Sequence, residues 1–138
     1  MIFDLRSLAC VEKTNFEKLD IYVLAEKLAD AIWDYAQRWS VLAKRTVGEQ
    51  VIRSADSIGA NIAEGSGRGT PTDNRRFLRM ARGSLYETRH WLRRAYRRKL
   101  LADDQSQTLL PIIEELTPKL NAYIRRVDRT IKGDDVEK

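Results

Sequence analysis

The sequence predicts an all-α protein that folds as an up-down-up-down antiparallel four-helix bundle. Apolar residues recur at spacings of three and four along four segments of the chain, which is the spacing of one face of an α-helix. The connections between these segments are short, and no stretch alternates in the manner of a β-strand. Short connections join antiparallel neighbours, and 138 residues are enough for one domain with one core.

The first two helices are predicted at residues 20–39 and 46–65. The second is expected to end at Gly65, because glycine adopts the left-handed conformation of a helix C-cap most easily. The apolar positions lie on one side of each helix, at Ile21, Leu24, Leu28, Ile32, Tyr35 and Trp39 in the first and at Val51, Ala55, Ile58 and Ile62 in the second.

The third helix is predicted at residues 71–101. Thr70 is suited to the N-cap, Pro71 to the first helical position, where its missing N–H costs nothing, and Asp73 to a capping exchange. Its apolar positions have the spacing of a helix that packs against near-parallel neighbours, and they are Leu78, Ala81, Leu85, Thr88, Leu92 and Ala95.

The fourth helix is predicted at residues 103–131, where Asp103 and Asp104 suit the N-cap and the first turn. Pro118 is expected to kink this helix or to remove one of its backbone hydrogen bonds. The chain is therefore divided into an N-terminal extension at 1–15, the bundle at 16–132 and a frayed polar tail at 133–138.

Composition argues against several classes of protein. No apolar run approaches the ~20 residues that a membrane helix needs, and no signal-peptide core is found near the start. A cytoplasmic protein without membrane contact is therefore expected. Cys10 is the only cysteine, so one chain contains neither a disulfide nor a cysteine-based zinc site.

Positive charge is concentrated on the third helix. Residues 51–100 hold twelve Lys or Arg and four Asp or Glu, a net charge of +8, although the whole chain carries +5. On a helical wheel a band roughly 80° wide and about 33 Å long contains Arg75, Arg79, Arg82, Tyr86, Arg89, Arg93 and Arg97, here called the arginine stripe. Arg76, Arg94 and Arg98 widen it on one flank, and His90 lies nearby.

The arginine stripe supports two interpretations. Guanidinium groups bind phosphates in pairs of hydrogen bonds, and an aromatic ring such as Tyr86 stacks on unpaired bases, so the stripe suits RNA or DNA. Like charges at spacing four repel, which argues against an ordinary solvated surface. The alternative is a contact between subunits, in which the stripe meets an acidic stripe on the first helix, formed by Glu26, Asp30 and Asp34.

No catalytic arrangement emerges. His90 is the only histidine, and with Glu87 it would give a two-ligand metal site in a cationic environment, which is unfavourable. Arg82 and His90 are too far apart for the arginine and histidine of a helical-bundle ribonuclease. The stretch GSGRG has neither the preceding strand nor the Gly-Lys-Ser/Thr of a phosphate-binding loop. We expect no enzyme activity, no cofactor and no metal.

Three stretches resemble a known family: FEKLDIYVLAEKLA, IRSADSIGANIAEGSGR and FLRMARGSLYET. They are similar to the small four-helix-bundle proteins encoded in intervening sequences of bacterial large-subunit ribosomal RNA genes, over residues 16–127. The resemblance implies an up-down bundle, commonly a homopentamer, without established catalysis. Its motif positions, interpreted mainly as structural, are Asn61, Glu64, Gly65, Arg82, Gly83, Ser84 and Glu87.

The same fold is similar to the accessory variability protein of diversity-generating retroelements, a basic pentameric barrel that binds a reverse transcriptase and nucleic acid. The resemblance thus implies an oligomer that binds RNA or DNA and serves as an accessory to a ribonucleoprotein or a reverse transcriptase. Large aromatic residues, which are enriched at interface centres, also favour assembly. They are Tyr22, Trp33, Tyr35, Trp39, Trp91, Tyr96 and Tyr123.

Overall fold

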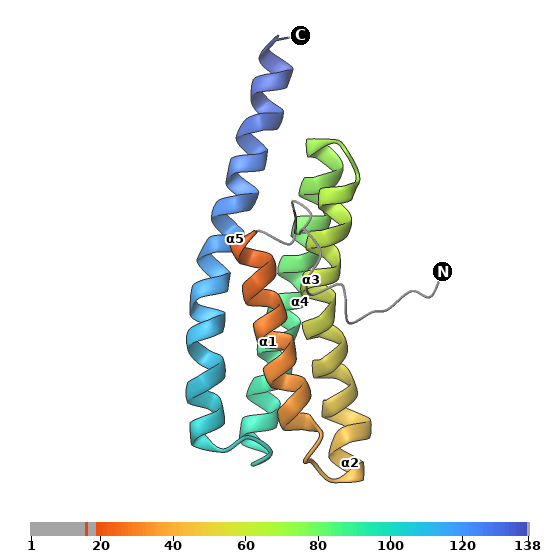
Figure 1. Ribbon diagram of the computed structural model, residues 1–138, viewed down its shortest axis with the longest axis vertical. Helices are drawn as coiled ribbons and strands as arrows, with labels where there is room; N and C mark the ends of the chain where they lie inside the picture. The colour runs from red at the N-terminus through yellow and green to blue at the C-terminus, as the bar shows by residue number, and fades with distance from the viewer. Residues whose placement is uncertain (1–15, 17–18, 138) are drawn as a thin grey trace, which may run out of the picture.

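The computed structural model describes Phe16 and residues 19–137, with side chains as far as residue 133. Within this part of the chain there are four long helices and no strand, and Figure 1 shows the long helices running alternately down and up. The predicted four-helix bundle is confirmed. The elements are α1 (Asp20–Ala36), α2 (Val41–Ala43), the π-helical segment η3 (Lys44–Gly48), α3 (Glu49–Gly67), α4 (Pro71–Arg97) and α5 (Asp103–Glu137).

The four long helices form a ring around the core in the order α1, α3, α4, α5. Helix α1 packs against α3 and α5, and α4 packs against the same two helices. Helices α1 and α4 are therefore diagonally opposite each other. The solvent faces of these two helices consequently point away from the bundle in opposite directions.

The core is built from all four long helices, as the apolar spacing predicts. The largest completely buried side chains come in pairs from each helix: Leu28 and Ile32, Ile58 and Ile62, Leu78 and Leu85, and Leu116 and Leu120. The core also contains one polar contact, in which the Thr88 hydroxyl donates to the Ser54 hydroxyl at 2.9 Å. Ser54 in turn donates to the Val51 carbonyl at 3.2 Å, so these buried polar groups are satisfied.

The turn between α3 and α4 differs from the expectation at Gly65. Helix α3 continues to Gly67, and the left-handed residue is Gly69, with φ of 85°. Gly65 is needed for another reason, because a Cβ atom there would lie 2.8 Å from Asn74 Oδ1 and 2.9 Å from Phe77 Cβ. Gly65 therefore allows α3 and α4 to approach closely.

The start of α4 matches the prediction. The Thr70 hydroxyl accepts a hydrogen bond from the Asp73 N–H at 3.2 Å, and Pro71 is the first residue of the helix. The end of α4 comes four residues before the predicted residue 101. The Lys99 N–H bonds to the Tyr96 carbonyl and the Leu100 N–H to the Ala95 carbonyl, and Lys99 has φ of 62°. These are the bonds of a Schellman cap, here with lysine in the left-handed position.

Two further boundaries differ from the prediction. Helix α1 ends at Ala36, before the expected residue 39. Ser40 then caps α2, and α2 leads through η3 directly into α3, so this helical segment starts at Val41 rather than at residue 46.

Helix α5 is longer than expected. It continues through Glu137, beyond the predicted end at residue 131 and through most of the segment expected to form a tail. Pro111 and Pro118 both lie inside α5, whose course changes direction part-way along its length in Figure 1. The N-terminal extension at 1–15, with Cys10, and Lys138 lie outside the described residues.

Substitution of Gly65 by alanine should destabilise the fold by about 1 to 3 kcal/mol, because the added methyl group overpacks the contact with α4. The matched control is Gly67→Ala, where no atom lies within 4 Å of the added Cβ and alanine also favours a helix. Urea unfolding at equal protein concentration measures both. Equal losses from the two substitutions would contradict the close approach at Gly65.

Candidate nucleic-acid interface

The side chains that α4 buries in the core determine where its arginines lie. Leu78, Leu85 and Leu92 are buried on one side of the helix, so the arginine stripe lies on the outer side, on the flank that borders α5. The stripe divides into two parts that differ in their surroundings. Its N-terminal part is tied to α5, whereas its C-terminal part is not.

The N-terminal part of the stripe is held by two side chains of α5. Arg75 Nη1 donates to Asp128 Oδ1 at 2.9 Å, and Arg79 Nη2 lies 3.8 Å from the same oxygen. Arg82 Nη1 donates to Asn121 Oδ1 at 3.1 Å. Asp128 and Asn121 are two helical turns apart and therefore share a face of α5, but the sequence contains no signal that they meet these arginines.

The flank of the stripe is also engaged near the start of α4. Arg76 Nη2 lies 3.7 Å from Asp73 Oδ1, and its guanidinium lies over the Phe77 ring at 4.7 Å. The guanidinium of Arg68 lies over the same ring at 4.9 Å. Such cation–π contacts hold these guanidinium groups close to the turn between α3 and α4.

The C-terminal part of α4, residues 86–98, is here called the basic segment. Arg89, Arg93 and Arg97 are exposed and none makes an ion pair or side-chain hydrogen bond within the described part of the chain. The same holds for the half-buried Arg94 and the exposed Arg98. The positive charge of the basic segment therefore remains largely uncompensated.

Two further predicted residues lie in the basic segment. The Tyr86 side chain is 48% exposed, so its ring is accessible between Arg82 and Arg89. His90 is exposed and lies edge-on to the Trp91 ring, with 4.8 Å between the ring centroids. Both residues are thus available to a ligand that approaches the arginines.

An apolar groove lies between the basic segment and the start of α5. Its volume is about 260 Å³. Arg89, Arg93 and Ser106 are its polar lining residues, and the rest of the lining is apolar. The Tyr96 hydroxyl donates to Asp103 Oδ1 at 3.1 Å, and this hydrogen bond raises the pKa of Tyr96. The apolar side chains of the groove are Leu92, Tyr96, Leu101, Leu109, Leu110 and Ile113.

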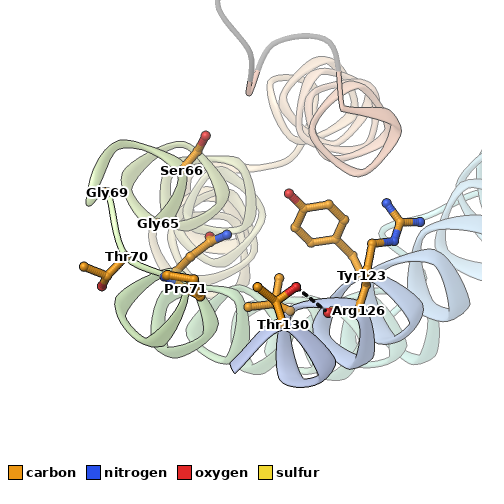
Figure 2. Close-up of a pocket in the computed structure, with 10 residues that line it drawn as sticks. Gly65, Ser66, Gly69, Thr70, Pro71, Tyr123, Arg126 and Thr130 are labelled. Carbon is orange, nitrogen blue, oxygen red and sulfur yellow. Dashed lines mark hydrogen bonds between the residues drawn. The ribbon is translucent and has the colours of Figure 1, made fainter. Parts of the chain in front are cut away.

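A second hollow of about 410 Å³ lies between the α3–α4 turn and α5. In Figure 1 this turn and the C-terminal part of α5 extend beyond the first residues of α1. Figure 2 shows Tyr123 and Arg126 of α5 on one side of the hollow and Thr70 and Pro71 on the other. The Arg126 guanidinium lies over the Tyr123 ring at 5.6 Å, and the turn itself contributes only neutral groups to the lining.

The acidic residues expected at subunit contacts lie on the opposite side of the bundle. Glu26, Asp30 and Asp34 are exposed on α1. A groove between α1 and α3 brings Asp56 close to Asp30 among alanines, and desolvation, followed by repulsion from Asp30, raises the pKa of the Asp56 carboxyl. Asp56 extends the acidic face, although nothing in its own helix points to α1.

The remaining motif residues act within their own helices. Asn61 Nδ2 donates to the Ser57 carbonyl at 2.8 Å, and Glu64 pairs with Arg68 at 3.0 Å. The Ser84 carbonyl lies 2.8 Å from the Thr88 hydroxyl and is a second acceptor for its one proton, beside Ser54. Gly83 and Glu87 are exposed. These positions are not brought together into one pocket.

The large aromatic residues expected at subunit interfaces fall into two groups, those that are exposed and those that pack against the core. Trp33 and Tyr96 are 54% and 50% exposed, whereas the other five that the sequence suggested for interfaces pack against the core, namely Tyr22, Tyr35, Trp39, Trp91 and Tyr123. Most of the aromatic surface thus serves the fold of one chain.

Neither a metal-binding cluster nor a membrane-spanning helix is found among the described residues. No three His, Cys, Asp or Glu side chains of this part of the chain come together as a metal site would require. Within the same part, no helix has both the length and the hydropathy to cross a membrane.

These observations define a small four-helix bundle with a basic face on α4 and an acidic face on α1. The sequence model of the family described as 23S rRNA-intervening sequence protein matches residues 17–122, and the chain belongs to this family. No curated protein matches the chain in sequence.

A solved structure supports the same fold. It is a protein with unknown function from the S23 ribosomal protein family of Bacteroides thetaiotaomicron, with a TM-score of 0.66 and 22% sequence identity. The match covers 75% of this chain and 97% of that one. At this identity the likeness concerns the fold alone.

The pair of Arg75 and Asp128 should make stability depend on pH. The hydrogen bond from Arg75 lowers the pKa of the Asp128 carboxyl below its ordinary value of 3.8. A lowered pKa in the folded state contributes stability above the unfolded value, and this contribution is lost as the pH falls through the folded value. Asp128→Asn should therefore lower the melting temperature at pH 7.

The difference in melting temperature between Asp128→Asn and the natural chain should shrink below about pH 4. Thermal unfolding of both proteins from pH 2 to pH 7 measures it. A difference that stays constant or grows on acidification would show that the Asp128 carboxylate is not stabilised by the arginines.

Proposed function

We propose that this protein is a non-enzymatic, oligomeric helical bundle that binds RNA or DNA through the arginine-rich face of α4. The observation that carries the proposal is the basic segment, in which Arg89, Arg93 and Arg97 are exposed and unpaired within the described residues. Guanidinium groups bind phosphate oxygens bidentately. A polyanion is the partner that this surface fits best.

The arginines of the stripe differ in how much of their charge is already compensated within the chain. Asp128 already compensates much of the charge of Arg75 and Arg79, so these two residues contribute less to an anion. Arg89, Arg93 and Arg97 follow one another at one helical turn, about 6 Å, and like charges at this spacing repel. A bound phosphate chain relieves this repulsion.

Assembly into an oligomer would raise the affinity of the basic segment for nucleic acid. In a ring such as the homopentamer that the family resemblance implies, several copies of the segment act on one nucleic acid, and linked weak contacts multiply the affinity. We propose a cytoplasmic accessory of a ribonucleoprotein or of a reverse transcriptase. The names of the family and of the Bacteroides relative mention ribosomal RNA and a ribosomal protein, so RNA is the first polymer to test.

A second candidate function is a self-assembling scaffold for contacts between proteins. The observation that favours it is the diagonal arrangement of α1 and α4. A head-to-tail contact would place the acidic face of one copy against the arginine stripe of the next, and contacts of this kind generate rings. The exposed Trp33 lies next to Asp34 on α1 and would add apolar area to that contact.

The double substitution Arg89→Gln/Arg93→Gln should flatten the salt dependence of binding to RNA or DNA. Each lost phosphate contact reduces the slope of log affinity against log salt by about 0.9 on duplex and about 0.7 on single strands. The measurement is a titration of short RNA and DNA at several salt concentrations. The control is Arg38→Gln/Arg53→Gln, which removes the same charge from exposed arginines outside α4 and should change the slope little.

A sizing experiment on the same double variant separates the two candidates. If the basic segment binds nucleic acid, the oligomer should stay intact, because exposed arginines contribute little to folding. Dissociation of the oligomer together with weak, salt-insensitive binding of the natural chain would favour the scaffold. A stable monomer of the natural chain in light scattering at micromolar concentration would contradict the oligomer in both.

A further inference from the structure

We propose that the basic segment selects single-stranded nucleic acid by taking one unpaired base into the apolar groove between α4 and α5, beside the ring of Tyr96. This inference rests on the proposed function and adds a class of ligand to it. It also assigns to Tyr96 a binding role, in place of the contact between subunits that the sequence suggested.

The groove has the size and the lining for one flat apolar group. Its volume of about 260 Å³ lies just below the range of about 300 to 1,000 Å³ that is typical of pockets for drug-sized molecules. Tyr96 on α4 and Leu110 on α5 form part of its lining and are 50% and 54% exposed. The groove therefore offers apolar surface that the fold itself leaves uncovered.

The Tyr96 ring is held in place at its polar end. Its hydroxyl donates to Asp103 Oδ1 in the first turn of α5, so the ring body remains for a contact with a ligand. Nucleobases stack on aromatic rings of this kind without strict sequence preference. A ring that is already fixed loses little freedom when a base binds.

Charge complementarity identifies the ligand as a nucleic acid strand. Arg89 and Arg93 line the same groove, and no described residue that lines it carries a carboxyl group. Along α4 the order is Tyr86, Arg89, Arg93, Tyr96, Arg97, so two rings and three guanidinium groups share one track about 16 Å long. Stacking rings and phosphate-binding cations in one track are the features of single-strand binding surfaces.

A duplex does not fit this arrangement equally well. The bases of a duplex are paired and stacked, so one base would first have to leave the stack. This step costs free energy that is not required in a single strand. A duplex would therefore contact the arginines alone. The expected consequence is a preference for single strands at the same salt concentration.

The test compares a short single-stranded RNA with its duplex, using the full chain and the variants Tyr96→Leu and Tyr96→Phe. Tyr96→Leu should weaken single-strand binding by roughly 5- to 160-fold, the range expected for one stacked base, and should change duplex binding little. Tyr96→Phe retains the ring but loses the hydrogen bond to Asp103, so it should keep most of the single-strand affinity. Leu42→Asn, at an exposed apolar residue outside α4 and α5, is the control and should have no effect.

A single strand that lacks bases along its central nucleotides gives an independent readout. This abasic strand should bind the natural chain about as weakly as the complete strand binds Tyr96→Leu, and the two losses should not add. Leu110→Asn, on the α5 side of the groove, should also weaken single strands selectively. Circular dichroism confirms that each variant is folded.

The outcomes separate this inference from the proposed function. Equal binding of single strand and duplex, with no effect of Tyr96→Leu but a clear loss in Arg89→Gln/Arg93→Gln, would overturn the groove and leave the nucleic-acid interface. Dissociation of the oligomer by Tyr96→Leu would show that the groove is a protein contact and would also overturn the inference. Absence of binding to any oligonucleotide would overturn both.

Discussion

The contact between α3 and α4 fixes how α4 is rotated about its own axis, and the exposure of the arginine stripe depends on it. The Thr88 hydroxyl must reach Ser54 inside the core, and Gly65 lets the two helices approach closely at the turn. A rotation of α4 by one residue, about 100°, would bring Arg89 to the place of Thr88. An unpaired arginine in the core would be very costly, so the sequence of α4 permits only one arrangement.

The availability of the arginines also depends on α5, which compensates the positive charge of α4 unequally along its length. Asp128 and Asn121 bind the arginines of the first half, whereas the part of α5 beside the second half contributes leucine and isoleucine to the groove. Arg94 and Arg97 belong to the last turn of α4, where cations interact favourably with the helix dipole. Arg89 and Arg93 lie before that turn, so they depend most on a partner outside the chain.

Much of the fold could be predicted from the sequence because it is encoded by local spacing. The apolar period located the four long helices and their buried faces, and Thr70 and Pro71 located the start of α4. The end of α4 could not be found in this way, since lysine is not a residue type that signals a left-handed cap. The prediction that Gly65 is a left-handed C-cap was wrong. Its actual role depends on a close approach of two helices, and the residues that it approaches lie nine and twelve positions further along the chain.

The candidate site could be predicted only in part, for a similar reason. The wheel of α4 placed the arginines on one face, but Asp128 is separated from Arg75 by 53 positions and no local pattern links the two. Tyr96 belongs to a groove that exists only when α4 and α5 pack together. Local spacing thus reveals which side chains share a face, and only the packed bundle reveals which of them are already compensated.

Photocrosslinking to a bound single-stranded RNA shows which face of the bundle the nucleic acid occupies. Irradiation of the complex, followed by mass spectrometry of the crosslinked peptides, identifies the side chains that touch the RNA. We expect crosslinks at Tyr86 and Tyr96, in the basic segment, that disappear as the salt concentration rises. Crosslinks confined to the acidic face of α1 or to the hollow beside Tyr123 would contradict this expectation.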